Sequence, residues 1–142
     1  MLQEGVFRTL QLVVPHMLES SAGDQVGWGR IILVSSTLAE AGIPMSSPYA
    51  TAKSALRGLA KVMAAELGPR GVLVNVVLPG LTSTERTVAG RVPERFIEPE
   101  TKATPTGRLS TPDDVAKVIV FLGSGANGNT TGQIIAVDGG KV

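Results

Sequence analysis

Cysteine is absent from this 142-residue chain, and histidine, tyrosine and tryptophan each occur once. Without cysteine there are no disulfides, thiolate nucleophiles or zinc–thiolate sites, which fits a reducing cytoplasm. The single histidine, His16, excludes a metal site built on two histidines. No apolar run approaches the roughly 20 residues that span a membrane, and the first residues lack the pattern of a signal peptide. We therefore expect a cytoplasmic protein with no metal centre.

Charge of either sign is also scarce. Thirteen Lys and Arg against twelve Asp and Glu leave a net charge of +1, with no basic cluster to meet nucleic-acid phosphates. Hydrophobic residues make up 43% of the chain and charged residues 18%, which is typical of a globular domain with a real core. We therefore expect one domain over residues 1–142 that binds neither nucleic acid nor a membrane.

Apolar spacing and helix-start signals predict three helices. They cover about residues 2–19, 48–67 and 112–123. Ser46 or Ser47 can cap the second helix and Thr111 the third, since each precedes a proline suited to the first helical position. The second helix is expected to bury Leu56, Leu59, Val62, Met63 and Leu67.

Short apolar runs predict three strands, and the first, whose run Ile31-Ile32-Leu33-Val34 does not alternate, is expected to be covered on both faces. They cover residues 30–35, 72–78 and 133–137. Residues 82–106, with three prolines, indicate either a flexible lid or short helices over a pocket, or else a plain surface loop. The order strand–helix–strand–helix–strand predicts an α/β fold with a parallel sheet of about three strands and flanking helices.

Three polar side chains point to chemistry at one edge of that sheet. Ser36 directly follows the first strand, and Tyr49 and Lys53 lie four residues apart on one face of the next helix. A cation close to a phenol favours the phenolate and lowers the tyrosine pKa. Carboxyl ends of parallel strands share one edge, so the three groups should converge there. They predict a site that donates a proton to a carbonyl.

One glycine motif is expected to have no function. Residues 123–128 match the dinucleotide pattern G-x-G-x-x-G letter for letter. That pattern binds pyrophosphate when it follows a strand and opens a helix, whereas here it follows a predicted helix and precedes a strand. We therefore predict an ordinary loop.

Several motifs together resemble the short-chain dehydrogenase/reductase family. They are Ser36, the segment Tyr49-Ala-Thr-Ala-Lys53, the segment Asn75-Val-Val-Leu-Pro79-Gly80 with Thr84, and the tail from Thr131 to Gly140. The resemblance covers nearly the whole chain, from about Gly5 to the last residue. It implies a partial Rossmann-like, doubly wound fold: the C-terminal catalytic half, without the N-terminal Gly-rich half that binds the nucleotide.

The resemblance also implies roles for individual residues. Tyr49 would be the acid–base group, Lys53 would lower its pKa and hold the ribose of NAD or NADP, and Ser36 would bind the substrate oxygen. Pro79, Gly80, Thr82 and Thr84 match the segment that lies along the nicotinamide. The implied function is NAD(P)-dependent carbonyl reduction or alcohol oxidation on a small molecule. A 3-oxoacyl reductase and a small-alcohol or sugar dehydrogenase fit equally.

If the N-terminal half of the family fold is missing, as the resemblance implies, one edge of the sheet should be exposed. The strand over residues 30–35 would lie at an open edge, and helices would expose apolar area. We therefore expect a homo-oligomer, a dimer or tetramer, with the helices over 2–19 and 48–67 as one family-like interface. The alternative function is a catalytically inactive remnant that serves as an oligomerising module. Hydrolysis by Ser36 is disfavoured, because no G-x-S-x-G elbow surrounds it.

Overall fold

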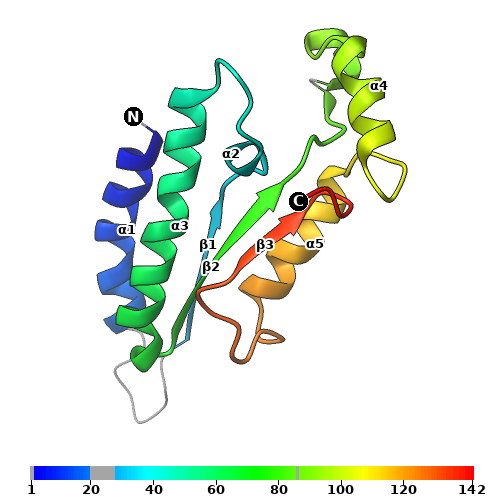
Figure 1. Ribbon diagram of the computed structural model, residues 1–142. Coiled ribbons are helices and arrows are strands. Elements are labelled where there is room, and N and C mark those ends of the chain that lie inside the picture. Colours follow the sequence, from blue (N-terminus) through cyan, green and yellow to red (C-terminus); the bar gives the residue numbers. More distant parts are fainter. Residues whose placement is uncertain (1, 20–27, 86) are drawn as a thin grey trace.

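Helices lie on both faces of a parallel sheet in the computed structural model, which describes residues 2–19, 28–85 and 87–142 (Figure 1). The helices are α1 (Leu2–Glu19), α2 (Leu38–Ala41), α3 (Ser47–Leu67), α4 (Glu94–Ala103) and α5 (Pro112–Gly123), with helical turns η1 (Gly68–Arg70) and η2 (Thr87–Arg91). The strands are β1 (Gly29–Val34), β2 (Val72–Pro79) and β3 (Ile134–Val137). No described helix combines the length and apolar character needed to cross a bilayer.

The sheet has the order β1-β2-β3, and both strand pairs are parallel. Ile31 of β1 lies opposite Val74 of β2, and Val77 of β2 lies opposite Ile135 of β3. This arrangement confirms the predicted α/β fold with three parallel strands. Within the part of the chain that the structure describes, β1 pairs with β2 alone and is therefore an edge strand, as the sequence predicts.

The core lies between the sheet and the helix pair α1 and α3, with α5 on the opposite face (Figure 1). All residues of β2 from Val72 to Leu78 are buried, so this strand is covered on both faces. The predicted cover on both faces is wrong for β1, where only Gly29, Ile31 and Leu33 are buried and Val34 is 42% exposed. The reason is its place at the sheet edge, where no further strand or helix covers the second face fully.

Two details of α3 differ from the prediction. Val62 is 55% exposed, because the helix buries Ala60 and Ala64 instead, whose small side chains let it approach the sheet closely. Ser46 occupies the N-cap position but makes no side-chain cap. Its hydroxyl donates to the carbonyl of Ile43 at 2.6 Å, in the turn that leads into the helix.

Helix α5 begins with the predicted cap. The Thr111 hydroxyl accepts from the Asp114 N–H at 3.2 Å, and the Asp114 carboxylate accepts from the Thr111 N–H at 2.8 Å, which makes a reciprocal capping box. Arg108 donates to both carboxylate oxygens of Asp114, at 2.6 and 3.2 Å. These bonds, with Arg108 as the largest cause, hold the pKa of the Asp114 carboxyl well below its usual range.

The capping box gives a pH-dependent prediction. The folded-state pKa of Asp114 is lowered, so its contribution to stability is complete above the unfolded value of about 3.9 and declines as the pH falls toward the folded pKa. Asp114→Asn should lower the melting temperature at pH 7, and the difference from the wild type should shrink steadily between about pH 5 and pH 2. Asp113→Asn is the control, since it removes the same charge from the same turn but not the cap. A difference that is constant with pH would contradict the prediction.

Candidate active site

The carboxyl ends of the strands bring the predicted site residues to one edge of the sheet. Ser36 follows the last residue of β1 by two positions, and Gly80 directly follows β2. Tyr49 is the third residue of α3, which begins at this same edge and packs back along β2 (Figure 1). Loops at the carboxyl ends of parallel strands are where α/β folds bind ligands.

Reciprocal hydrogen bonds join the start of α3 to the end of β1. The Lys53 ammonium donates to the Val34 carbonyl at 2.8 Å, and the Ser35 hydroxyl donates to the Lys53 carbonyl at 2.9 Å. The Lys53 Nζ also lies 5.8 Å from the centroid of the Tyr49 ring. The cation and the phenol are therefore held on one face of the helix, and that face is fixed to the strand that carries Ser36.

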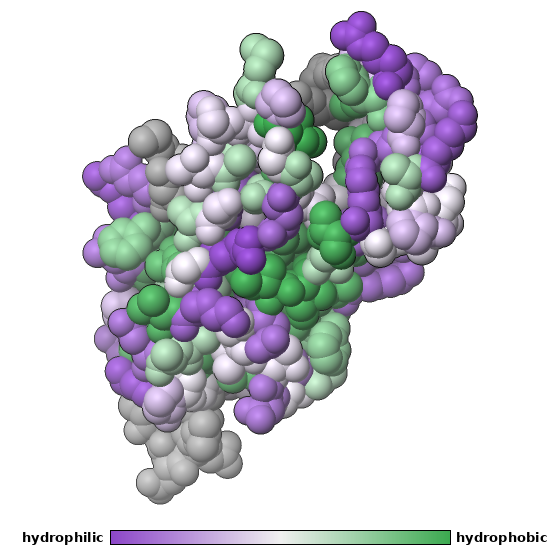
Figure 2. All heavy atoms as spheres, viewed as in Figure 1, coloured by the Kyte–Doolittle hydropathy of each residue, from purple (hydrophilic) through white to green (hydrophobic). Residues whose placement is uncertain are grey.

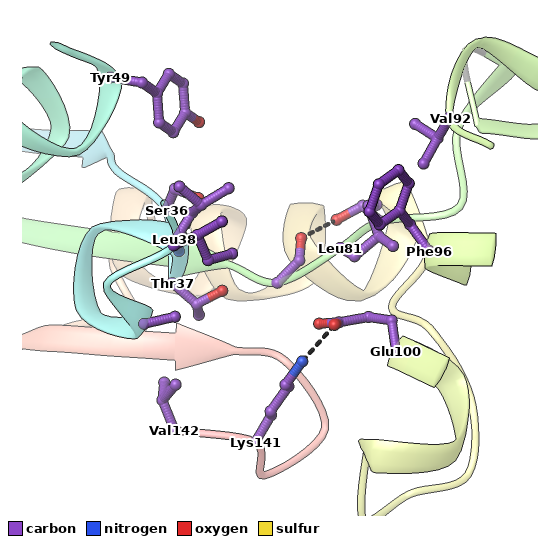
Figure 3. Close-up of a pocket in the computed structure, with 14 residues that line it drawn as sticks. Ser36, Thr37, Leu38, Tyr49, Leu81, Val92, Phe96, Glu100, Lys141 and Val142 are labelled. Atoms are coloured by element: carbon purple, nitrogen blue, oxygen red, sulfur yellow. Dashed lines mark hydrogen bonds and ion pairs between the residues drawn. The ribbon is translucent and has the colours of Figure 1, made fainter. Parts of the chain in front are cut away.

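A cavity of about 400 Å³ opens at this edge, and Ser36, Tyr49, Gly80 and Thr82 all line it (Figure 3). Tyr49 is 45% exposed, so its hydroxyl is accessible to a small molecule. The Ser36 oxygen accepts from the Leu38 N–H at 3.2 Å, which leaves its own O–H free to donate to a ligand. Two hydroxyl donors thus meet in a cavity large enough for a small carbonyl compound.

The other predicted residues lie outside the cavity lining or form hydrogen bonds in the segments next to it. The Pro79 carbonyl accepts from the Thr37 N–H at 3.1 Å, which ties the segments after β1 and β2 together. The Thr84 and Thr87 hydroxyls lie 3.2 Å apart, and the Thr87 hydroxyl donates to the Thr82 carbonyl at 2.8 Å. Neither Pro79, Thr84 nor Lys53 belongs to the cavity lining itself.

Gly80 occupies a position where a side chain would not fit. A Cβ built there would lie 2.8 Å from the Asp138 Cβ and 3.1 Å from the Asp138 Cα, so any larger residue would force the chain after β2 away from the chain after β3. The Gly80 N–H donates to the Val137 carbonyl at 3.0 Å across the same contact. The glycine therefore keeps the floor of the cavity closed.

Most residues that line the cavity were not among the predicted site residues, including four with polar, charged or aromatic side chains. Thr37 directly follows Ser36, Phe96 and Glu100 come from α4, and Lys141 comes from the segment after β3. Of the alternatives for residues 82–106, the structure has short helices over a pocket. No local pattern could have indicated Glu100 or Lys141, because their proximity arises only from the tertiary fold.

The G-x-G-x-x-G segment does not belong to the lining of this cavity. Residues 123–128 follow α5 and lead to β3, and Asn127 within them is fully buried. Its side chain donates to the carbonyls of Leu122 and Thr130, both at 3.1 Å. The segment is a loop after a helix, as predicted. Across residues 2–19, 28–85 and 87–142, no three His, Asp or Glu side chains gather as a metal site would require.

Comparison with known proteins agrees with this geometry. The family model described as enoyl-(acyl carrier protein) reductase matches residues 3–141. The chain belongs to the short-chain dehydrogenase/reductase family.

Relatives in the short-chain dehydrogenase/reductase family include enzymes with different substrates. The chain is 38% identical over 139 residues to the 3-oxoacyl-[acyl-carrier-protein] reductase FabG of Thermotoga maritima, covering 98% of this chain and 53% of that protein. A gluconate 5-dehydrogenase from Burkholderia cenocepacia, solved in complex with NADP and tartrate, superimposes with a TM-score of 0.85 at 34% identity. That match covers 96% of this chain and 51% of the other.

The chain therefore spans about half the length of the short-chain dehydrogenases/reductases that it matches. Another relative, the 3alpha-hydroxysteroid dehydrogenase of Mediterraneibacter gnavus, is 39% identical over 113 residues, which are 80% of this chain and 44% of that protein. The matched half contains the edge of the sheet that holds Ser36, Tyr49 and Lys53.

Proposed function

We propose that the chain carries the catalytic site of an NAD(P)-dependent oxidoreductase that reduces a carbonyl or oxidises an alcohol. One observation carries the proposal: the Ser36 and Tyr49 hydroxyls line the same cavity, while Lys53 lies one turn from Tyr49 on the same helix. Family membership supports it, since the relatives are named as reductases and dehydrogenases. Residues 1–142 would then form one partial Rossmann-like domain, the C-terminal portion of the family fold, in a cytoplasmic enzyme.

Each of the three residues has a role that its surroundings permit. Tyr49 would give its phenolic proton to the carbonyl oxygen during reduction and take it back during oxidation. Ser36 would donate a hydrogen bond to the same oxygen and so orient the carbonyl. Lys53 would hold its positive charge one helical turn from Tyr49 and bind the cofactor ribose. The nicotinamide cofactor, when bound, supplies or accepts the hydride.

The chemistry of the donors fits one end of such a cofactor. Lys53 has three ammonium protons, and one bonds to the Val34 carbonyl, so donors remain for ribose hydroxyls. Pro79, Gly80, Thr82 and Thr84 would lie along the nicotinamide, with Thr82 Oγ1 already turned to the Gly80 carbonyl at 3.0 Å. A Gly-rich turn between a strand and a helix, which would hold the pyrophosphate, is not found among the described residues.

Cofactor binding should be measurable as thermal stabilisation. NADH or NADPH should raise the melting temperature. At a cofactor concentration of ten times the dissociation constant, the free energy of unfolding should increase by about 1.4 kcal/mol. Because the donors fit the nicotinamide end, reduced nicotinamide mononucleotide should give most of this effect and AMP almost none. Differential scanning fluorimetry with the four ligands is the measurement. No shift with either dinucleotide would contradict the proposal and favour the inactive oligomerising remnant.

The substrate class has two candidates. A 3-oxoacyl compound is supported by the reductases of Thermotoga maritima and Aquifex aeolicus, which are 38% and 39% identical. A small alcohol or sugar acid is supported by the gluconate 5-dehydrogenase structure. Both fit carbonyl chemistry at Tyr49.

We also infer that the chain associates with itself as a dimer or tetramer. Phe7, Leu12 and Val62 on α1 and α3 are 50%, 72% and 55% exposed, which leaves apolar area on the outer helix face. The edge strand β3 gives a second apolar region, visible in the middle of Figure 2. Covering these surfaces would also relieve the open sheet edges.

Light scattering tests this association directly. The wild-type chain should elute as a dimer or tetramer, and Leu12→Lys should shift it toward a smaller species, since a charge is costly to bury in an apolar interface. Val120→Lys is the matched control, because Val120 is similarly exposed, at 67%, but lies on α5. A monodisperse wild-type monomer would overturn the inference.

A further inference from the structure

The cavity has a charged pair at the end opposite the tyrosine. Glu100 of α4 and Lys141 of the C-terminal segment form an ion pair, and both side chains line the cavity, which also contains Ser36 and Tyr49. Figure 3 shows the pair across the cavity from the Tyr49 ring, with Phe96 on the same side as Glu100. Their side chains are only 29% and 31% exposed, so the pair is partly shielded from solvent.

Local structure fixes the position of both charges. The Asp138 carboxylate accepts from the N–H groups of Gly140 and Val142, at 3.0 and 2.9 Å, and so shapes the turn that carries Lys141. On the other side, the Thr104 hydroxyl donates to the Glu100 carbonyl at 2.8 Å at the end of α4. The backbone segments that carry both charges are therefore ordered by hydrogen bonds at the cavity wall.

The two elements are also packed directly on each other. The Gly139 backbone has φ of +73°, and a Cβ there would lie 2.4 Å from the Thr106 Oγ1 and 2.5 Å from the Thr104 Cγ2. The Thr106 N–H donates to the Gly139 carbonyl at 3.3 Å. The segment after α4 thus contacts the turn after β3 closely, which brings Glu100 and Lys141 within reach of each other.

The rest of the wall is largely apolar. Apart from the hydroxyls and the ion pair, the lining includes Leu38, Ile43, Leu81, Val92 and Phe96. A ligand that reaches from Tyr49 to the far end therefore meets apolar surface and then a pair whose charges cancel. A carboxylate at that end would have to compete with Glu100 for Lys141 and would face repulsion from Glu100.

We propose that the Glu100–Lys141 pair determines substrate charge, selecting carbonyl compounds with an uncharged, apolar far end over those with a carboxylate. The inference rests on the proposed carbonyl site, and it deepens it by naming a substrate class. Of the two candidates above, it favours an acyl-type compound over a sugar acid, whose carboxylate the self-neutralised pair would exclude. Glu100 and Lys141 act as specificity-determining residues and not as catalytic ones.

Two ketones of similar size test this selection without turnover. The probes are 4-methylcyclohexanone and 4-oxocyclohexanecarboxylate, and ligand-observed NMR titration at pH 7 gives the ratio of their dissociation constants. The wild-type chain should bind the neutral ketone more tightly. Glu100→Gln frees the Lys141 ammonium and should shift the ratio toward the carboxylate by about fivefold, the upper end for a partly exposed pair.

Removing the Lys141 charge should shift the ratio of dissociation constants in the opposite direction. Lys141→Met leaves Glu100 unpaired and should shift the ratio further toward the neutral ketone, and the double variant should return to the wild-type ratio. Glu98→Gln is the matched control, because it breaks the exposed Glu98–Lys102 pair on the same helix and changes the net charge equally. That control should leave the ratio unchanged.

Specific results would overturn the inference. The inference is wrong if Glu100→Gln leaves the ratio unchanged or if Glu98→Gln causes the same shift. It is also wrong if neither ketone binds the wild-type chain. If Glu100→Gln does not fold, the sign of the Lys141→Met shift decides. Because these titrations need neither cofactor nor reaction, a chain that binds ketones as expected but shows no cofactor stabilisation would refute the proposed function and leave the charge selection intact.

Discussion

Tyr49→Phe should lower the rate of NAD(P)H-dependent ketone reduction by about 10²–10⁴-fold, the usual contribution of a positioned acid–base group. The variant loses only the phenolic hydroxyl and keeps the aromatic ring. Its ring remains to contact Lys53, whose Nζ lies 5.8 Å from the ring centroid in the wild type. Loss of nicotinamide absorbance on addition of ketone measures the rate.

A second hydroxyl on the same helix provides the control for this variant. Thr51 is exposed and lies two residues after Tyr49, so it points to a different side of α3. Thr51→Val should keep the wild-type rate, and both variants should keep the wild-type melting temperature. If Tyr49→Phe retained most of the activity, Tyr49 would not be the proton donor. A wild-type chain without any turnover would support the inactive remnant.

Asn75→Leu should reduce the free energy of unfolding by about 2–4 kcal/mol, as urea denaturation would show. Asn75 is 1% exposed in the middle of the central strand β2. Its amide donates to the Thr130 carbonyl at 2.8 Å and accepts from the Gln133 N–H at 3.0 Å. Leucine has similar size but can make neither bond, so the Gln133 N–H loses its partner in the segment that leads into β3.

The same substitution on the surface is the control for this loss. Asn129 is exposed in the loop before β3, and Asn129→Leu should change the stability by no more than about 0.5 kcal/mol. Equal effects of the two variants would mean that the buried hydrogen bonds of Asn75 contribute little. A loss confined to Asn75→Leu would show that its side chain contributes strongly to the contact between β2 and the chain before β3.

The elements with local signals could be predicted well from the sequence. Helix α5 begins at Pro112 after the Thr111 cap and ends at Gly123, as expected, because the residues that start and stop it are neighbours in the chain. The buried face of α3 was less predictable. Alanines at 60 and 64 pack against the sheet, and a search for large apolar residues selects Val62 instead.

The site could be predicted in part for a topological reason. Parallel strands bring their carboxyl ends together, so the shared edge of Ser36 and Tyr49 follows from the order of elements. The ion pair between Glu100 and Lys141 does not, since the two residues are far apart in the chain and meet only through the packing of α4 on the C-terminal turn. The absence of a side-chain cap at Ser46 could not be predicted either, because the Ser46 hydroxyl is turned toward the Ile43 carbonyl in the preceding turn.

The strand order also has a consequence for synthesis. Each strand lies next to the one translated before it, so β2 can dock on β1, and β3 on β2, in the order in which they leave the ribosome. Among the three described strands, none has to be inserted between two that have already paired. Strand β3 adds only to the free side of β2, so β1 and β2, with α3 between them in the chain, can assemble before β3 has been translated.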